Sequence, residues 1–169
     1  MFLIVTYNGL IRLRNMVDEA WNQISVQLKR RHDLIPNLVN TVKGAMEFER
    51  GTLEAVISAR AKALSATGVA ATAKAEGELT QAVGKLFALA ENYPELKSSA
   101  NVLQLQEELG GTENKISFAR QLYNDTATQY NTKQAQFPTN LVAGLAKASP
   151  AELWQITDEG ERAVPKVQL

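Results

Sequence analysis

The sequence predicts an all-α protein, arranged as an antiparallel up-and-down four-helix bundle. Apolar residues recur three and four positions apart over long stretches, which is the spacing of one face of a helix. No stretch shows the two-residue alternation of a half-buried strand between turn residues. Short connections separate most of the helical patterns, and short connections favour antiparallel neighbours. The alternative is an elongated, kinked helical hairpin in which the first two segments are fused.

The first long pattern lies between Val17 and Arg50 and predicts a helix with one apolar stripe. Arg31 and Glu49 occupy stripe positions, and the apolar members are Val17, Trp21, Ile24, Leu28, Ile35, Leu38, Val42 and Ala45. Because a buried guanidinium must be paired, we expect Arg31 to be at least partly buried against an acid. The candidate acids lie on the fourth segment: Glu107, Glu108 and Glu113. Such a pair would fix the register of the helices, and docking of a partner by Arg31 is the alternative.

Pro36 predicts a helix boundary inside this pattern. Proline disrupts a helix interior but is tolerated in a first turn, and Asp33 can cap a new helix. We therefore expect one helix over residues 8–31 and a second over residues 34–65. The apolar stripe keeps its phase across Pro36, which is what a continuous, kinked helix would show.

Two further helices are expected beyond residue 65. Small residues around Gly68 predict a connection, and the third pattern, from Leu79 to Tyr93, ends at Pro94, which suits the first turn of the next segment. The fourth pattern is the most regular, and we expect only a loosened turn at Gly110-Gly111. Its members are Val102, Leu105, Leu109, Thr112, Ile116, Ala119, Tyr123, Thr126, Tyr130, Lys133 and Phe137. A short amphipathic stretch (residues 141–145) and a tail containing prolines follow.

The chain begins with an apolar run, Met1–Val5, which we treat separately from the bundle. It is too short to span a bilayer, which takes about 20 residues, and it lacks the basic start of a signal peptide. We interpret residues 1–6 as the stub of a membrane helix, residues 7–148 as the bundle and residues 149–169 as a C-terminal tail. A first helical turn packed on the bundle is the alternative for the apolar run.

Composition argues against several classes of site. Eighteen basic and eighteen acidic residues balance to a net charge of zero, so the basic excess of a nucleic-acid-binding protein is absent. The chain has no cysteine, hence no disulfide or thiolate metal site. His32 is the only histidine, and the di-iron signature Glu-x-x-His is missing. We therefore expect no metal, no cofactor and no nucleic-acid partner.

Catalytic residues are equally scarce. His32 lies in the charged run Lys29–Asp33, where we interpret it as a helix-end cation with Asp33 as the cap. Glu107, Glu108 and Glu113 could perform acid–base chemistry, although a charged run on a helix is usually a solvated face. We therefore expect that the protein is not an enzyme. The alternative is an enzyme or ligand carrier whose charged cleft is lined by Arg31, His32 and these carboxylates.

A Tyr-Asn pair recurs one heptad apart, at Tyr123-Asn124 and Tyr130-Asn131. We expect the tyrosines in the core, with their hydroxyls reaching polar groups at its rim. The adjacent asparagines would cross-link helices. The candidate structural or interaction residues are therefore Arg31, Asp33, Pro36, Glu107, Glu108, Glu113, Tyr123 and Tyr130.

Taken together, these motifs resemble the LemA family of bacterial membrane-anchored helical proteins. The strings that carry the resemblance are QLKRRHDLIPNLV at residues 27–39, YPELK at 93–97, LQEEL at 105–109, YND at 123–125 and YN at 130–131. The resemblance implies a four-helix antiparallel bundle behind one N-terminal transmembrane helix. It therefore implies a single-pass protein of the cell membrane, without specifying the side.

The family resemblance implies no reaction, because LemA-like proteins have no established catalytic residues. Some relatives are linked to bacterial organelle membranes, and family genes often lie beside a gene for a membrane metalloprotease. Both associations imply a protein partner, with a membrane protease as the candidate. The function expected from the sequence is a non-enzymatic, membrane-tethered helical interaction or scaffold domain.

Overall fold

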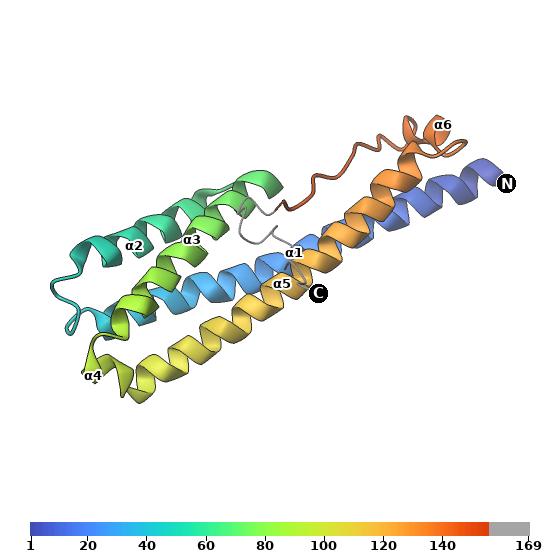
Figure 1. Ribbon diagram of the computed structural model, residues 1–169. Coiled ribbons are helices and arrows are strands. Elements are labelled where there is room, and N and C mark those ends of the chain that lie inside the picture. Colours follow the sequence, from blue (N-terminus) through green and yellow to red (C-terminus); the bar gives the residue numbers. More distant parts are fainter. Residues whose placement is uncertain (156–169) are drawn as a thin grey trace, which may run out of the picture. The chain divides into compact units, whose positions relative to one another are not determined.

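The computed structural model describes residues 1–155, and this part of the chain is helical without strands (Figure 1). Its helices are α1 (Phe2–Val42), α2 (Arg50–Ser65), α3 (Val69–Ala90), α4 (Pro94–Lys97), α5 (Ala100–Ala135) and α6 (Asn140–Ala143). The all-α expectation is confirmed. The expected C-terminal tail lies partly outside the described residues.

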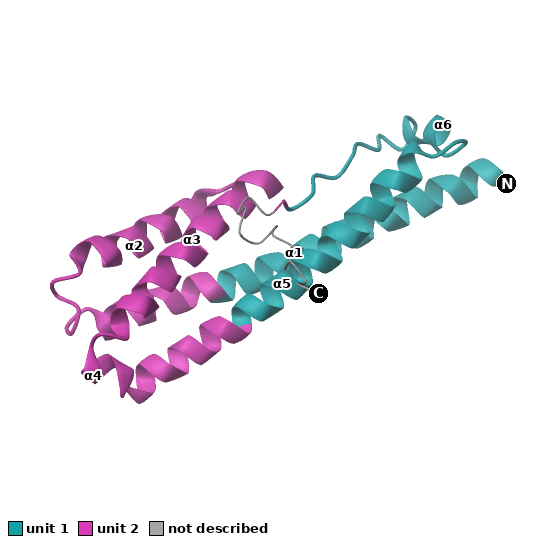
Figure 2. Ribbon diagram, viewed as in Figure 1, with its two compact units in different colours: residues 1–30, 112–154 teal, residues 31–111, 155–169 magenta. Residues whose placement is uncertain are grey.

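The chain forms two compact units, coloured separately in Figure 2. Unit 1 contains residues 1–30 and 112–154, and unit 2 contains residues 31–111. The two long helices, α1 and α5, contribute residues to both units. The up-and-down bundle topology of the whole chain stays a prediction.

The core of unit 2 draws on the end of α1, on α2, α3 and α4, and on the start of α5. Leu38, Val56 and Leu79 are completely buried in it, and each such side chain contributes about 1.5–3 kcal/mol through the hydrophobic effect. Helices α2 and α3 pack antiparallel on each other (Figure 1). Gly68 enters α3 with a φ of 82°, a conformation that glycine adopts without steric cost, so the glycine in the predicted connection is explained.

The core of unit 1 is formed by two apolar stripes, one on each long helix. The buried residues are Leu10, Val17, Ala20, Ile24 and Leu28 on α1, and Ile116, Ala119, Tyr123, Ala127 and Tyr130 on α5. Trp21 packs on Tyr123, with ring centroids 5.4 Å apart. The α5 stripe predicted from the heptad is therefore correct as far as Tyr130. Its last two members, Lys133 and Phe137, are exposed.

The predicted boundary at Pro36 is wrong. Helix α1 continues through Pro36 to Val42, and α2 begins only at Arg50. An interior proline costs a helix about 3 kcal/mol. Burial of Ile35, Leu38 and Val42 in phase with the residues before Pro36 offsets that cost. Asp33 consequently lies inside α1 as an exposed residue and caps no helix.

The helix bounds confirm the prediction for Pro94 and show no interruption of the helix at Gly110-Gly111. Pro94 occupies the first turn of α4, as expected. Helix α5 runs through Gly110-Gly111 without interruption, so the glycines mark no break. Among the described residues, no helix combines the length and the hydropathy that crossing a bilayer requires.

Candidate functional site

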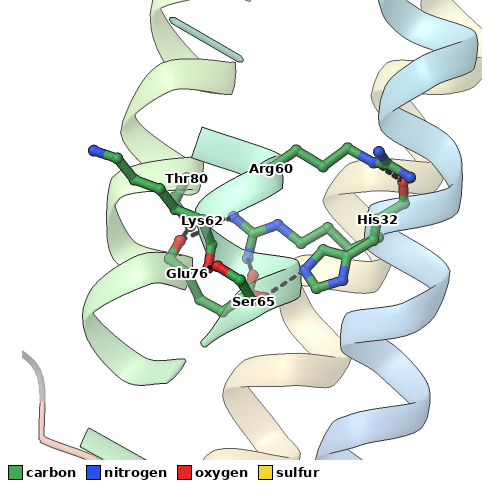
Figure 3. Close-up of polar contacts among 7 residues, drawn as sticks. His32, Arg60, Lys62, Ser65, Glu76 and Thr80 are labelled. Carbon is green, nitrogen blue, oxygen red and sulfur yellow. Dashed lines mark hydrogen bonds and ion pairs between the residues drawn. The ribbon is translucent and has the colours of Figure 1, made fainter. Parts of the chain in front are cut away.

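A polar cluster with a buried centre lies in unit 2, and we call it the Arg31 cluster. It consists of Arg31 and His32 from α1, Arg60 from α2, and Glu76 and Thr80 from α3. Figure 3 shows His32, Arg60, Glu76 and Thr80 as sticks. Arg31, His32 and Glu76 are only 4%, 7% and 2% exposed. Charged side chains are almost never buried to this extent unless they are paired, so the contacts within the cluster decide its role.

One carboxylate holds two basic side chains at the centre of the cluster. His32 Nε2 lies 2.5 Å from Glu76 Oε1, and Arg31 Nη1 lies 3.6 Å from Glu76 Oε2. Because an ionised carboxylate only accepts hydrogen bonds, Nε2 is the ring nitrogen that donates. Glu76 is therefore the common partner of two consecutive α1 side chains.

Arg31 also contacts the backbone and a hydroxyl of α3. Its Nη2 donates to Thr80 Oγ1, and the same nitrogen lies 3.4 Å from the carbonyl oxygen of Glu76. Thr80 in turn donates to that carbonyl over 3.0 Å. The guanidinium thus bridges a carboxylate, a hydroxyl and a main-chain oxygen on one turn of α3, which ties α1 to α3 in a single register.

The fifth member of the cluster, Arg60, compensates for Pro36. In an α-helix the carbonyl of residue 32 would accept a hydrogen bond from the N–H of residue 36, which proline lacks. Arg60 Nε donates to the His32 carbonyl over 2.7 Å instead. The His32 carbonyl therefore has a hydrogen-bond donor despite the proline. This bond also connects α2 to α1 beside the contact between His32 and Glu76.

The sequence located Arg31 correctly but did not single out Glu76. Arg31 is buried and paired as expected, and Glu76 is one acid in contact with it. A signal for Glu76 was present, because it stands three residues before Leu79 on the apolar stripe of α3. Pairing of Arg31 with the fourth-segment acids stays a prediction; Glu107 is exposed, whereas Glu108 and Glu113 are half-buried.

The interpretation of His32 as a helix-end cation is wrong. His32 lies inside α1, is buried, and faces Glu76 rather than a helix terminus or a cap. The burial of Arg31 and His32 also argues against an open cleft lined by these two residues.

A groove of about 760 Å³ lies elsewhere in unit 2, between the end of α1 and α2. It is lined by Val39, Asn40, Lys43, Gly44, Glu47, Arg50, Leu53, Glu54 and Ile57.

A second polar arrangement, in unit 1, holds the non-helical segment 151–154 against α5. Asn131 receives a hydrogen bond from the Ala151 N–H over 2.7 Å and donates to the Ala151 carbonyl over 2.9 Å. Asn124 makes the same pair of bonds with Trp154, over 2.8 and 2.9 Å. We call these two residues the asparagine brackets. They bind main chain, and the expectation that they cross-link helices is wrong.

The heptad spacing of the brackets matches the segment that they hold. Seven residues of α-helix rise about 10.5 Å, and three residues of extended chain span about 10 Å. Asn124 and Asn131 are seven residues apart, and their partners Trp154 and Ala151 are three residues apart. Each amide side chain therefore reaches a backbone N–H and C=O in the same geometry.

Both tyrosines of the repeated pair are buried as expected, and Tyr123 places its hydroxyl against a polar group. Tyr123 and Tyr130 are 3% and 4% exposed, and the Tyr123 hydroxyl donates to the Glu152 carbonyl over 2.6 Å. Burial raises the pKa of Tyr123 above its ordinary value of 10.0, and the nearby carboxylates of Glu152 and Asp18 raise it further. Trp154 completes the packing, with its ring 6.1 Å from that of Trp21.

The sequence is similar to that of known proteins over most of its length. The model of the LemA family matches residues 20–169. Protein LemA of Metamycoplasma hominis is 33% identical over 138 residues, which are 80% of this chain and 63% of that relative. The chain thus spans less than two-thirds of the relative's length.

Two magnetosome proteins are similar at lower identity. Magnetosome protein MamQ 2 of Paramagnetospirillum magneticum is 22% identical, and magnetosome protein MamQ of Magnetospirillum gryphiswaldense is 21% identical. Each match covers 99% of this chain and 71% of the relative. The family match includes every residue of the Arg31 cluster and both asparagine brackets, and the chain belongs to the LemA family.

Proposed function

We propose that this protein is a non-enzymatic, membrane-tethered helical domain that serves as an interaction scaffold. The observation that carries the proposal is the apolar start of α1. Phe2, Leu3, Ile4 and Val5 are 55–66% exposed although they are consecutive. Successive residues point about 100° apart around a helix, so these four cover all its sides. An apolar helical turn exposed in every direction is suited to the interior of a bilayer.

The contacts of the Arg31 cluster support a structural role over a catalytic one. Arg31 and His32, the residues that a charged cleft would have to use, are buried and engaged with Glu76. General acid–base catalysis needs a group that a substrate can reach within hydrogen-bonding distance. Because the side chains of Arg31 and His32 fix the register of packed helices, they support a scaffold role.

We propose that the partner is a protein, with a membrane protease as the candidate. The groove between α1 and α2 supports such a contact, because Ile57 on its wall and the neighbouring Phe48 are 53% and 93% exposed. Exposed aromatic and aliphatic side chains at the edge of a groove are typical of protein-docking surfaces. The single-pass tether would hold this surface near other membrane proteins.

Fractionation of the native protein tests the tether. The protein in its own cells should remain in the membrane pellet after a high-salt wash, and the variant Leu3→Asp/Ile4→Asp should move towards the soluble fraction. The control is Phe48→Asp/Ile57→Asp, which changes exposed apolar residues of unit 2 and should stay in the pellet. Finding the unaltered protein wholly in the soluble fraction would remove the tether from the proposal.

Photo-crosslinking tests the scaffold. A photoreactive residue at Phe48 should yield a crosslink to a membrane protein, and the same residue at the exposed position Lys85 should not. Equal labelling of the two positions would contradict docking at the groove. A crosslink to a soluble protein alone would exclude a membrane protease as the partner.

A further inference from the structure

The α6 region of unit 1 exposes apolar side chains in an ordered arrangement. Leu141 and Leu145 are 68% and 75% exposed, and Phe137, four residues before Leu141, is 80% exposed. The opposite side of the same turns is buried, at Thr139, Val142 and Ala146. Large apolar side chains therefore lie on the exposed side of the region as well as on its buried side. A solvated face would instead be polar or charged.

This exposed apolar face is held in a defined conformation. The Val142 N–H donates to the Thr139 carbonyl over 2.9 Å, and the Ala146 N–H donates to the Val142 carbonyl over 3.1 Å. The region ends in a Schellman-type turn, in which Ala148 N–H bonds the Ala143 carbonyl and Lys147 adopts a φ of 47°. Phe137, Leu141 and Leu145 are consequently displayed by a fold with its own hydrogen bonds.

A second exposed apolar stretch of unit 1 is the first turn of α1, Phe2–Val5. Figure 1 shows α6 at the end of unit 1 where the chain begins. Two apolar surfaces from distant parts of the sequence thus occur at one end of one compact unit. A single bilayer surface would meet both.

The charged residues that flank these two stretches in the described sequence are basic. Residues 1–17 contain Arg12 and Arg14 and no acid, and residues 126–151 contain Lys133 and Lys147 and no acid. All four basic side chains are exposed. Within residues 1–17 and 126–151, each apolar stretch therefore has only basic charged neighbours along the sequence. Basic residues bordering an apolar surface complement anionic lipid headgroups.

We propose that the apolar face of Phe137, Leu141 and Leu145, bordered by Lys133 and Lys147, docks on the surface of an anionic bilayer. The three side chains would enter the headgroup–acyl boundary, and the lysines would contact lipid phosphates. This contact is separate from the α1 tether and rests on the membrane location in the proposed function. Its effect is to restrict the tilt of unit 1 on the membrane, because contacts at α1 and at α6 define an orientation that one tether leaves free.

Environment-sensitive labels on the full chain test the docking. The protein has no cysteine, so single substitutions place a fluorophore at one site: Leu141→Cys for the α6 face, Leu3→Cys for the tether, and Leu64→Cys as the exposed control in unit 2. Vesicles of phosphatidylglycerol and phosphatidylethanolamine should shift the Leu141 label to the blue and leave the Leu64 label unchanged. Pure phosphatidylcholine should produce a weaker shift.

The outcomes separate this inference from the tether. A response of the Leu3 label without the Leu141 label overturns docking by α6 and leaves the tether standing. A response of the Leu141 label alone supports docking and counts against the tether. A blue shift of the Leu141 label that grows with protein concentration in the absence of vesicles identifies a second copy of the chain as the occupant, and overturns the proposal.

Charge variants test the lipid specificity. Lys133→Gln/Lys147→Gln should weaken binding to the anionic vesicles roughly tenfold or more, because each basic residue near an anionic surface strengthens attachment appreciably. The control Lys74→Gln/Lys85→Gln removes two exposed charges from unit 2 and should leave binding unchanged. Equal effects of the two pairs would show that net charge, and not the α6 face, governs vesicle binding.

Discussion

Arg60 supplies the hydrogen bond that Pro36 removes from α1. The proline has no N–H to offer the His32 carbonyl, and Arg60 Nε donates to that oxygen over 2.7 Å from the neighbouring helix α2. A local defect in one helix is thereby converted into a contact between two helices. The relationship also explains why α1 continues where its sequence predicted a boundary.

The Arg60–Pro36 relationship predicts that the two residues are energetically coupled. Arg60→Ala should destabilise the parent by about 1.5–3 kcal/mol, the usual cost of losing a hydrogen bond to a charged group. In a Pro36→Ala background the restored N–H can bond the His32 carbonyl, so the same Arg60→Ala change should cost clearly less. Urea unfolding of the four proteins measures the coupling, and strictly additive effects would contradict it.

Removal of Arg31 should reveal whether its role is structural. Arg31→Ala leaves Glu76 without its guanidinium and should cost about 3–5 kcal/mol, as for a broken buried ion pair. Arg31→Met combined with Glu76→Leu should recover most of the loss, since neither ion is then left alone. Arg30→Ala, at an exposed neighbour, is the control and should change the free energy of unfolding by less than about 1 kcal/mol.

If Arg31 instead docks a partner, the Arg31→Ala variant should give a different experimental result. If Arg31 serves a partner, Arg31→Ala would melt like the parent protein and lose the membrane partner in a crosslinking pull-down. We expect the opposite, a large drop in melting temperature, because Arg31 is 4% exposed.

The raised pKa of Tyr123 predicts a loss of stability at alkaline pH. A folded-state pKa above the unfolded value means that the protonated phenol is favoured in the folded protein. Its contribution is complete below pH about 10 and is lost as pH rises through the folded pKa. Tyr123→Phe should therefore be less stable than the parent at pH 7, by about 1 kcal/mol for the lost bond to Glu152, and the difference should shrink above pH about 10.

Urea unfolding from pH 7 to pH 11 measures this convergence. Tyr7→Phe, at an exposed tyrosine, serves as the control for general alkaline effects. A constant difference between the parent and Tyr123→Phe over the whole range would contradict the prediction.

The asparagine brackets predict protection of two particular amides. Asn131→Leu removes both bonds to Ala151, each worth about 1 kcal/mol, so exchange of the Ala151 amide should accelerate roughly 30-fold. Asn124→Leu should do the same at Trp154 and shift the tryptophan emission to the red. Asn114→Leu, at an exposed α5 position, is the control, and hydrogen exchange resolved by residue is the measurement. Unchanged exchange at both amides would mean that the brackets do not hold the segment.

The periodicity of the sequence determined the helices and their buried faces. The spacing of three and four residues identified the apolar stripes of α1 and α5, and it placed Arg31 in the core. These features are local, because they depend on which residues share one side of a single helix. The resemblance of the motifs to the LemA family also came from the sequence, and the family match confirms it.

Only the tertiary structure decided where α1 ends. Pro36 and Asp33 carry the local signals of a helix boundary, yet α1 passes through both because its stripe is buried on either side. The propensity of a short segment amounts to a few kcal/mol, and burial of several apolar side chains outweighs it.

Partners distant in the chain could not be deduced from spacing. Glu76 for Arg31, Arg60 for the His32 carbonyl, and the backbone of Ala151 and Trp154 for the asparagines all come from other segments. The sequence by itself determined that buried polar residues would need partners, since desolvation makes unpaired groups costly. Only the packing of the helices decided which partners these are, because hydrogen bonds require atoms within about 3 Å, and that proximity is set by the fold.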